Sequence, residues 1–543
     1  MWYPRSMTTP RRLARRLRPI VPFWLLGLGL LLYRPEPLAA QNRDAAAVAV
    51  ELARLRQVQE DQQRLLDSLV RELEATRAEA AVPPANQRTE AQLQALEVLH
   101  ELDTRRVDHV LNAQDPEESG FLSSGLFGGK FRVDLSGYLK FDANWADQQL
   151  QDGDLLFLAR GKRTPLDNSQ FTISGRESRF ALTIQGPPVL GAQTGGKFEL
   201  DFFGGVGGLN QGANSAQPEP ALRSAFFSLI WAQPDGRKAT ELMIGQDFVP
   251  FGNWFPHLTT FAKGVDVGTY FLLAPQAKLV QRWKFGAKGG QELRFSAAVA
   301  RSISGVFGLA GDLNTGNNFV GIAEQRGLPE FHGSLLYANE GLGRAPFWGM
   351  PTPFTLSVSG VYGEERLVDF GGLPGNTRDF KKWGVDAKLF VPIIGSRNGK
   401  PRGTLSLKAY ATIQQNLDEG LGNGLTGIVL RPNGDPTNIN DLKSARGRAG
   451  WAELTYYATN TTYFHGMIGR LRNNRFDGVV EGFAFPTATG FSGARQNTRY
   501  TLSVKQQIQN ILVGVDYSHI DTDFMNGQTG GINNVLVGTY YFF

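Results

Sequence analysis

The six histidines of this chain are the first residues to weigh for catalysis or metal binding. They are His100, His109, His257, His332, His465 and His519. Their spacing matches no metal-ligand motif, and a hydrolytic site would need a histidine beside a nucleophile on one surface. His519 precedes Asp521 by two residues, which is only a weak indication of catalysis. We therefore predict no catalytic residues, no metal site, no cofactor and no enzyme activity.

The sequence contains neither a phosphate-binding motif nor a residue for thiolate chemistry. The glycine-rich run GGVGGLNQG from Gly204 lacks the helix and the Lys-Ser/Thr pair that a phosphate-binding loop requires, so it predicts a plain connection. The chain contains no cysteine, which excludes disulfides and thiolate metal sites.

Basic side chains recur on the polar side of segments in which polar and apolar residues alternate. The candidates for a pore lining are Lys140, Arg179, Lys197, Arg282, Arg294, Lys388, Lys408 and Arg499. If these side chains line one water-filled pore, their combined electrostatic field would attract anions without a tight binding site. Carboxylates such as Glu199 and Asp386 share that side, so each cation could instead merely neutralise a neighbour.

A further candidate is the segment FVPFGNWFPHLTTFAKGVDVGTYFLLAP, which begins at Phe248. It is the most apolar of the long connections, and its aromatic residues would favour aggregation if they were exposed to solvent. We expect it to fold into a lumen, with packing against a neighbouring subunit as the alternative. In the first case His257, Lys263 and Asp266 contribute to a constriction.

These residues need a scaffold, and the sequence indicates a β-barrel. After Gly129 the hydrophobic period changes to two residues, clearest in RVDLSGYLKFDANW, where Leu139 and Phe141 alternate with Tyr138 and Lys140. One face of such a strand suits lipid and the other suits water. We expect an all-β transmembrane barrel of about 16 antiparallel strands.

The strands can be placed along the chain. Alternating segments begin near Arg132, Arg176, Thr194, Ala221, Ala239, Gln276, Gln291, Phe331, Thr352, Lys381, Arg402, Ser444, Thr461, Gln496, Asn510 and Ile532. Short turns, such as those after Trp231 and Phe285, alternate with long polar connections, as in an up-and-down barrel. Aromatic residues at strand ends predict interfacial girdles. They are Trp145, Trp231, Trp283, Trp383 and Tyr456-Tyr457.

Residues 1–40 read as a secretory signal, because arginines precede the apolar run from Ile20 to Tyr33. A retained anchor is the alternative, although the run is shorter than the roughly 20 residues that span a bilayer. This segment carries seven arginines and one glutamate, so its removal changes the formal net charge from +5 to −1. The basic pI of 9.2 therefore gives no reason to expect a nucleic-acid partner.

Residues 41–82 are predicted to form a trimerising coiled coil in the periplasm. Between Val48 and Thr76 apolar residues follow a heptad, interrupted by Gln59 and Gln62, and polar core residues can fix register and oligomeric state. An isolated surface helix is the alternative. Residues 83–130 are predicted to be a second helical segment and linker, and residues 131–543 the barrel.

Several segments resemble the DcaP-like outer-membrane porins and, more distantly, the phosphate-selective porins. They are SGYLKFDANW, RESRFALTIQG, GGKFELDFFGG, LRSAFFSLIW and IGQDFVPFG. The resemblance covers most of residues 132–290 and the preceding coiled coil. It implies a homotrimer with three separate pores, a periplasmic helical stalk, and anionic solutes such as dicarboxylates. The mixed charges on the inward faces argue against phosphate specificity.

The sequence therefore predicts a porin in the outer membrane of a Gram-negative bacterium, giving passive diffusion to small hydrophilic, anionic solutes. Outer-membrane lipid and the barrel-assembly machinery are the other expected partners. The closing segment VLVGTYYFF, with Phe543 at its end, resembles the signal which that machinery reads. A barrel hydrolase and a structural anchor that uses the coiled coil are the alternatives.

Overall fold

The computed structural model describes residues 131–148, 150, 156–159, 168–204, 219–260, 263–286, 289–303, 326–368, 375–417, 427–479, 485–487 and 490–543. The predicted signal peptide, coiled coil and second helical segment lie outside these ranges. In the described part of the chain no helix is long and apolar enough to cross a membrane.

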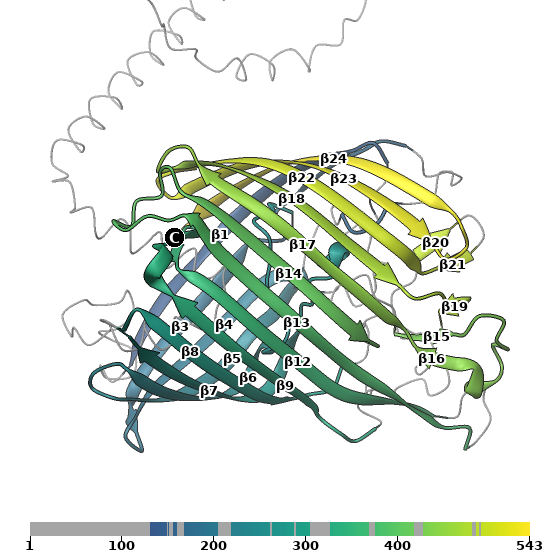
Figure 1. Ribbon diagram of the computed structural model, residues 1–543, viewed down its shortest axis with the longest axis horizontal. Helices are drawn as coiled ribbons and strands as arrows, with labels where there is room; N and C mark the ends of the chain where they lie inside the picture. The colour runs from purple at the N-terminus through teal and green to yellow at the C-terminus, as the bar shows by residue number, and fades with distance from the viewer. Residues whose placement is uncertain are drawn as a thin grey trace, which may run out of the picture. The chain divides into compact units, whose positions relative to one another are not determined.

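The described chain forms a closed antiparallel β-barrel of 16 strands (Figure 1). The barrel strands are β1 (Arg132–Ala146), β3 (Arg179–Val189), β4 (Ala192–Gly204), β5 (Glu219–Ala232), β6 (Lys238–Phe248), β7 (Leu273–Phe285), β8 (Gln291–Ala300), β9 (Glu330–Asn339), β12 (Phe354–Leu367), β13 (Arg378–Ile394), β14 (Leu405–Gln415), β17 (Arg446–Tyr457), β18 (Thr462–Asn473), β22 (Ala494–Ile508), β23 (Ile511–Phe524) and β24 (Thr529–Phe542). Each pairs with the next, and β24 pairs with β1 to close the ring.

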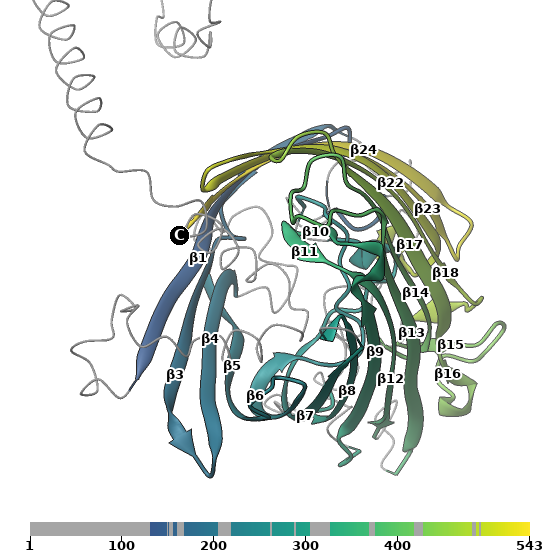
Figure 2. The same ribbon diagram turned by 60° about the vertical axis from the view of Figure 1, so that its left-hand side comes forward.

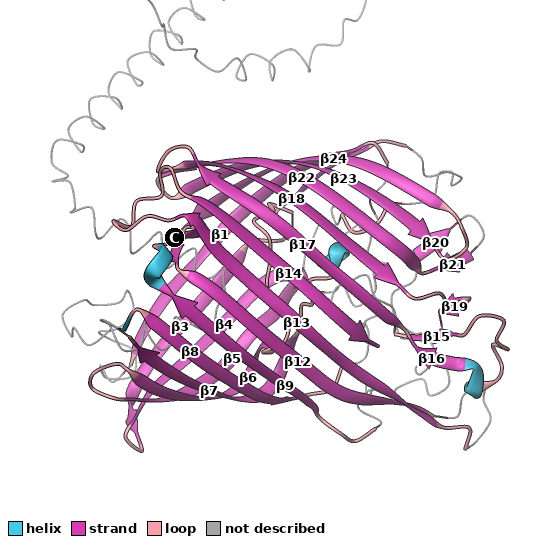
Figure 3. Ribbon diagram, in the orientation of Figure 1, coloured by secondary structure: helices cyan, strands magenta, loops and turns pink. Residues whose placement is uncertain are grey.

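Shorter elements complete the structure (Figure 3). They are β2 (Gln170–Ser174), β10 (Ala345–Phe347), β11 (Met350–Thr352), β15 (Ile428–Leu430), β16 (Leu442–Ser444), β19 (Gly478–Val479), β20 (Phe485–Thr487), β21 (Gly490–Ser492) and the 3-10 helices η3 (Val265–Val267), η5 (Glu340–Leu342) and η7 (Ile439–Asp441). We call the end of the barrel where β1 begins and β24 finishes the terminal end, and the opposite end the loop end.

The predicted alternation of side chains is confirmed. On β1 the outward Leu139 and Phe141 are half exposed, whereas the inward Tyr138 and Lys140 are buried. All 16 observed strand starts lie within three residues of the predicted ones. One girdle residue was wrongly placed. Tyr456 faces outward as expected, but Tyr457 points inward and stacks on Tyr463, because successive strand residues face opposite sides.

Two local features depart from a regular up-and-down barrel. The strand beside β1 is interrupted, so that β2 pairs with the half of β1 at the loop end and β3 with the other half. The connection of residues 340–353 lies at the terminal end, yet it is long and carries the β10–β11 hairpin. The sequence patterns predicted neither feature.

Candidate functional site

The connection between β6 and β7, of which the structure describes residues 249–260 and 263–272, packs inside the barrel in those ranges, and we call it the luminal loop. Its apolar residues Phe251, Trp254, Leu258 and Tyr270 are all buried. Its backbone is hydrogen-bonded to side chains on the far wall, which strands β1, β13, β14, β17, β22 and β23 supply.

Both acidic and basic side chains on that wall form hydrogen bonds with the main chain of the luminal loop. Carboxylates accept its amide hydrogens: Gly252 N donates to Asp386 at 2.7 Å, His257 N to Glu453 at 2.6 Å and Thr259 N to Asp516 at 2.5 Å. Lysines donate to its carbonyls: Lys140 to Thr259 at 2.6 Å, Lys388 to Pro250 at 3.2 Å, Lys408 to Phe255 and Lys505 to His257. Charge-assisted hydrogen bonds of this kind are stronger than neutral ones.

Glycines on the inner wall give the luminal loop room to approach. A side-chain carbon at Gly469 would lie 2.6 Å from Val267, and one at Gly538 would lie 2.2 Å from Thr259. These distances are shorter than any van der Waals contact, so the loop lies against backbone at both positions. A larger residue at either glycine would have to displace it.

His257 lies at the centre of the luminal loop and is fully buried. Its Nδ1 contacts Glu453, and its Nε2 accepts a hydrogen bond from the backbone N–H of Trp348 at 2.7 Å. Burial lowers the pKa of His257, although Glu453 opposes the shift. A neutral ring that donates from Nδ1 and accepts at Nε2 satisfies both contacts.

Lys263 and Lys140 both contact Glu177, which lies in the turn between the end of β2 and the start of β3. Glu177 contacts Lys140 directly and lies 3.0 Å from Lys263. Burial opposes ionisation of this carboxyl, but the two ammonium groups outweigh it and lower the pKa of Glu177 to about 2. Burial also lowers the pKa of Lys263 to about 8.

Asp266 and Arg499 form a buried ion pair between η3 of the luminal loop and β22, with N and O atoms 3.1 Å apart. Burial raises the pKa of Asp266 to about 6, although Arg499 opposes the shift. Arg499 also donates to Ser518 at 3.1 Å. The three loop candidates therefore all contact charged residues of the wall.

The β10–β11 hairpin enters the lumen from the terminal end and meets the luminal loop (Figure 2). Trp348 at its tip lies over His257, with ring centroids 4.9 Å apart. Phe347 stacks near Trp254 at 5.1 Å, and the ammonium of Lys408 lies 3.2 Å from the Phe347 ring centre. The sequence analysis missed this hairpin. The available signal was the apolar composition of APFWGMPT, which lies between the strands expected to begin near Phe331 and Thr352.

The remaining predicted cations lie on the wall formed by β3 to β8. Arg179 and Lys197 both pair with Glu199, at 3.5 Å and 2.6 Å. Arg223, which the sequence analysis did not single out, bridges Glu199 and Asp201 at 2.8 Å each.

Arg282 on β7 and Arg294 on β8 are direct cross-strand partners, and both point inward and are buried. Arg294 also contacts Glu292. Like charges that face each other across a strand pair are destabilising unless another group compensates them.

No group of three or more histidine and carboxylate residues that could hold a metal ion occurs in the described ranges. His519 and Asp521 form a pair at 3.2 Å on the outer side of β23, where His519 also contacts Asn533 at 2.8 Å. The arrangement around the luminal loop contains charged anchors and aromatic packing. It is suited to shaping a passage by size and charge.

A closed barrel that is apolar outside and polar inside, with the luminal loop and the β10–β11 hairpin packed in its lumen, defines the class of porin-like β-barrels. Among solved structures the chain is similar to the outer-membrane channel DcaP of Acinetobacter baumannii, with 16% identity, 78% of this chain and 100% of that chain covered, and a TM-score of 0.54. The similarity to DcaP expected from the sequence is confirmed at the level of the fold.

Other solved structures with similarity include an anion-selective porin from Comamonas acidovorans, with 12% identity, 76% and 100% of the two chains covered, and a TM-score of 0.42. OprB of Pseudomonas putida has 13% identity, 75% and 94% coverage, and a TM-score of 0.41. No protein-family model matches the sequence. No curated protein matches it either.

Proposed function

We propose that this chain is an outer-membrane porin that gives passive diffusion to small hydrophilic, anionic solutes, dicarboxylates among them, through a lumen narrowed by the luminal loop. The single observation that supports this best is the binding of that loop to the far wall by carboxylates and lysines on six strands. A connection held in this way reduces the cross-section of the barrel and leaves the remaining passage lined by charge.

The proposed anion preference is supported by the wall of β3 to β8. Its described inward side chains include seven cations and five carboxylates, which leaves an excess of positive charge. The cations are Arg179, Lys197, Arg223, Lys278, Arg282, Lys284 and Arg294, and the carboxylates are Glu199, Asp201, Glu241, Asp247 and Glu292. An excess of one sign on a confined surface raises the local concentration of the opposite ions.

The predicted coiled coil of residues 41–82 and the resemblance to DcaP-like porins support a homotrimer as part of the same proposal. The outward band of Leu139, Phe141 and similar residues supports insertion into a lipid bilayer. The long connections would then face the exterior, and the N-terminal helices the periplasm.

Single-channel recording in a planar bilayer tests the proposal. Stepwise conductance is expected, and a reversal potential under a potassium chloride gradient should show a preference for chloride. The double variant Arg282→Gln, Arg294→Gln should shift the permeability ratio toward cations, by about twofold for each charge if luminal potentials are of order kT. A bilayer that stays sealed despite inserted protein would contradict the porin function, and a preference of the natural protein for cations would contradict the anionic solute.

A further inference from the structure

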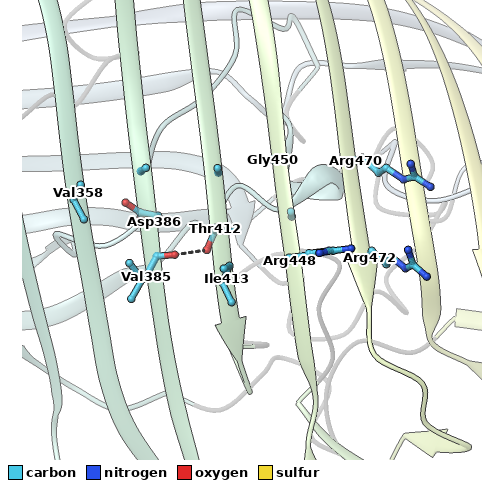
Figure 4. A pocket seen from close by; sticks show the side chains of 12 residues that line it. Val358, Val385, Asp386, Thr412, Ile413, Arg448, Gly450, Arg470 and Arg472 are labelled. Atoms are coloured by element: carbon cyan, nitrogen blue, oxygen red, sulfur yellow. Dashed lines mark hydrogen bonds between the residues drawn. The ribbon is translucent and has the colours of Figure 1, made fainter.

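The outer face of the barrel carries a groove that the passage through the lumen does not use. It has a volume of about 640 Å³ and lies across β12, β13, β14 and β17 (Figure 4). The floor consists of small residues that are cross-strand neighbours: Ala387 lies opposite Ala411, and Ala411 lies opposite Gly450. A row of small residues across adjacent strands leaves a trough between the larger outward side chains Val358 and Ile413.

One end of the groove is lined by arginines. The partner of Gly450 on β18 is Arg470, and the next outward row ends at Arg448 and Arg472, which are cross-strand partners of each other. Figure 4 shows the three side chains on neighbouring strands, extended in the same direction across the sheet. All three are exposed.

These three arginines form no ion pair with any residue in the described part of the chain. Arg470 contacts the neutral amide of Gln496 on β22. The outward carboxylates Asp521 and Asp523 lie one strand further, on β23, and pair with His519 at 3.2 Å and Arg495 at 3.3 Å.

Such a cluster is unfavourable on a surface that faces lipid. An arginine on the lipid face of a barrel destabilises it, most strongly at the bilayer midplane and least near the interface. Three neighbouring guanidinium groups add mutual repulsion. A phosphate group removes both costs, because guanidinium groups bind phosphate through paired, charge-assisted hydrogen bonds.

We propose that this face binds a phosphorylated lipid of the membrane leaflet at the loop end, with phosphate on Arg448, Arg470 and Arg472 and an acyl chain over Ala387, Ala411 and Gly450. A second outward groove of about 480 Å³, over Ala452 and Gly466 on β17 and β18, offers room for another chain. A second copy related by a two-fold axis is disfavoured as the occupant, because that symmetry would bring arginine against arginine, and a copy packed in a ring is left to the oligomer measurement below. The inference rests on the proposed outer-membrane location.

The test uses the full chain purified in detergent, with bisphosphorylated lipid A as the probe and native mass spectrometry with thermal unfolding as readouts. The natural protein should retain the lipid and gain thermal stability from it. The triple variant Arg448→Gln, Arg470→Gln, Arg472→Gln should lose about tenfold in affinity, which follows from losing about 1.4 kcal/mol. Ala411→Trp should weaken lipid binding by filling the groove while it keeps the arginines.

The matched control is Arg366→Gln, since Arg366 is outward on β12 but already pairs with Asp379 at 2.7 Å and 3.0 Å. It should bind lipid A as the natural protein does. Unchanged lipid binding by the triple variant would overturn the proposal. Equal stabilisation of the natural protein by dephosphorylated lipid A or by inorganic phosphate alone would also overturn it. So would a triple variant whose oligomers dissociate while lipid binding stays intact, because this result would make the face a subunit interface. Conductance of the triple variant should stay normal, so failure here is distinguishable from failure of the porin function, which would show as a sealed bilayer.

Discussion

Asp266 is a titratable group of the luminal loop whose ionisation changes the charge of the proposed passage. Burial raises its pKa to about 6, with Arg499 as its only ion-pair partner in the described ranges. Between pH 7 and pH 5 the carboxyl gains a proton, and the charge of Arg499 is then no longer neutralised. We expect the anion-to-cation permeability ratio to rise by about twofold over this range, because one luminal charge changes the energy of a passing ion by an amount of order kT.

Reversal potentials at pH 7 and pH 5 check this expectation, with Asp266→Asn as the comparison. The variant should show at pH 7 the ratio that the natural protein reaches only at pH 5, and it should lose most of the pH dependence. A natural protein and variant that respond alike to pH would show that another group is responsible.

The roles of individual luminal residues were only partly predictable from the sequence. Alternation identified Lys140, Lys388 and Lys408 as inward-facing, because it depends on neighbours along one strand. It could not show that their ammonium groups bind carbonyls of the luminal loop, since Lys140 and Thr259 are 119 residues apart. Glu177 was missed because it lies where the strand pattern is broken.

At the scale of elements, the luminal loop packs tightly enough for a covalent test of its position. The chain has no cysteine, so any disulfide within it must form between introduced cysteines. The double variant Thr259→Cys, Gly538→Cys should form a disulfide on mild oxidation, because a side-chain carbon at Gly538 would lie 2.2 Å from Thr259. Thr259→Cys also removes the methyl carbon that a side chain at Gly538 would meet, so the cross-link should hold the loop where it already lies and leave conductance unchanged.

The matched control is Thr259→Cys with Gly466→Cys, because Gly466 on β18 faces outward beside Leu502. This pair should stay reduced. Electrophoresis with and without reductant distinguishes the two variants. A cross-link in the control, or none in the first pair, would place the loop elsewhere.

Strands were the most predictable elements, and connections the least. A strand start follows from a period of two over about ten residues, which a single pass along the sequence detects. The β10–β11 hairpin has no such period. Its position depends on the contact between Trp348 and His257, two residues that are distant in the chain. Inward folding of the luminal loop was foreseen from its aromatic composition alone, because composition shows that a segment needs burial.

At the scale of the whole molecule, the outward apolar band makes a thermodynamic prediction. Leu139→Arg, at the middle of β1, should lower the free energy of unfolding in lipid vesicles by about 2–4 kcal/mol. The same change at Leu190, which is 84% exposed in the turn after β3, should cost about 0–1 kcal/mol. Urea titrations of both variants measure the difference, and equal costs would mean that β1 does not face hydrocarbon.

The predicted assembly depends on residues 48–76, so conductance and oligomeric state should be separable. Each barrel closes on itself through β1 and β24, and its luminal loop is bound within one chain. A barrel without the coiled coil should therefore still conduct. Deletion of residues 48–76 should convert three-step closures into single steps of the same size, because the apolar heptads that would join the helices are gone. Deletion of residues 83–113 is the control and should keep the three-step pattern. Three-step closures that survive the first deletion would assign trimerisation to the barrel walls.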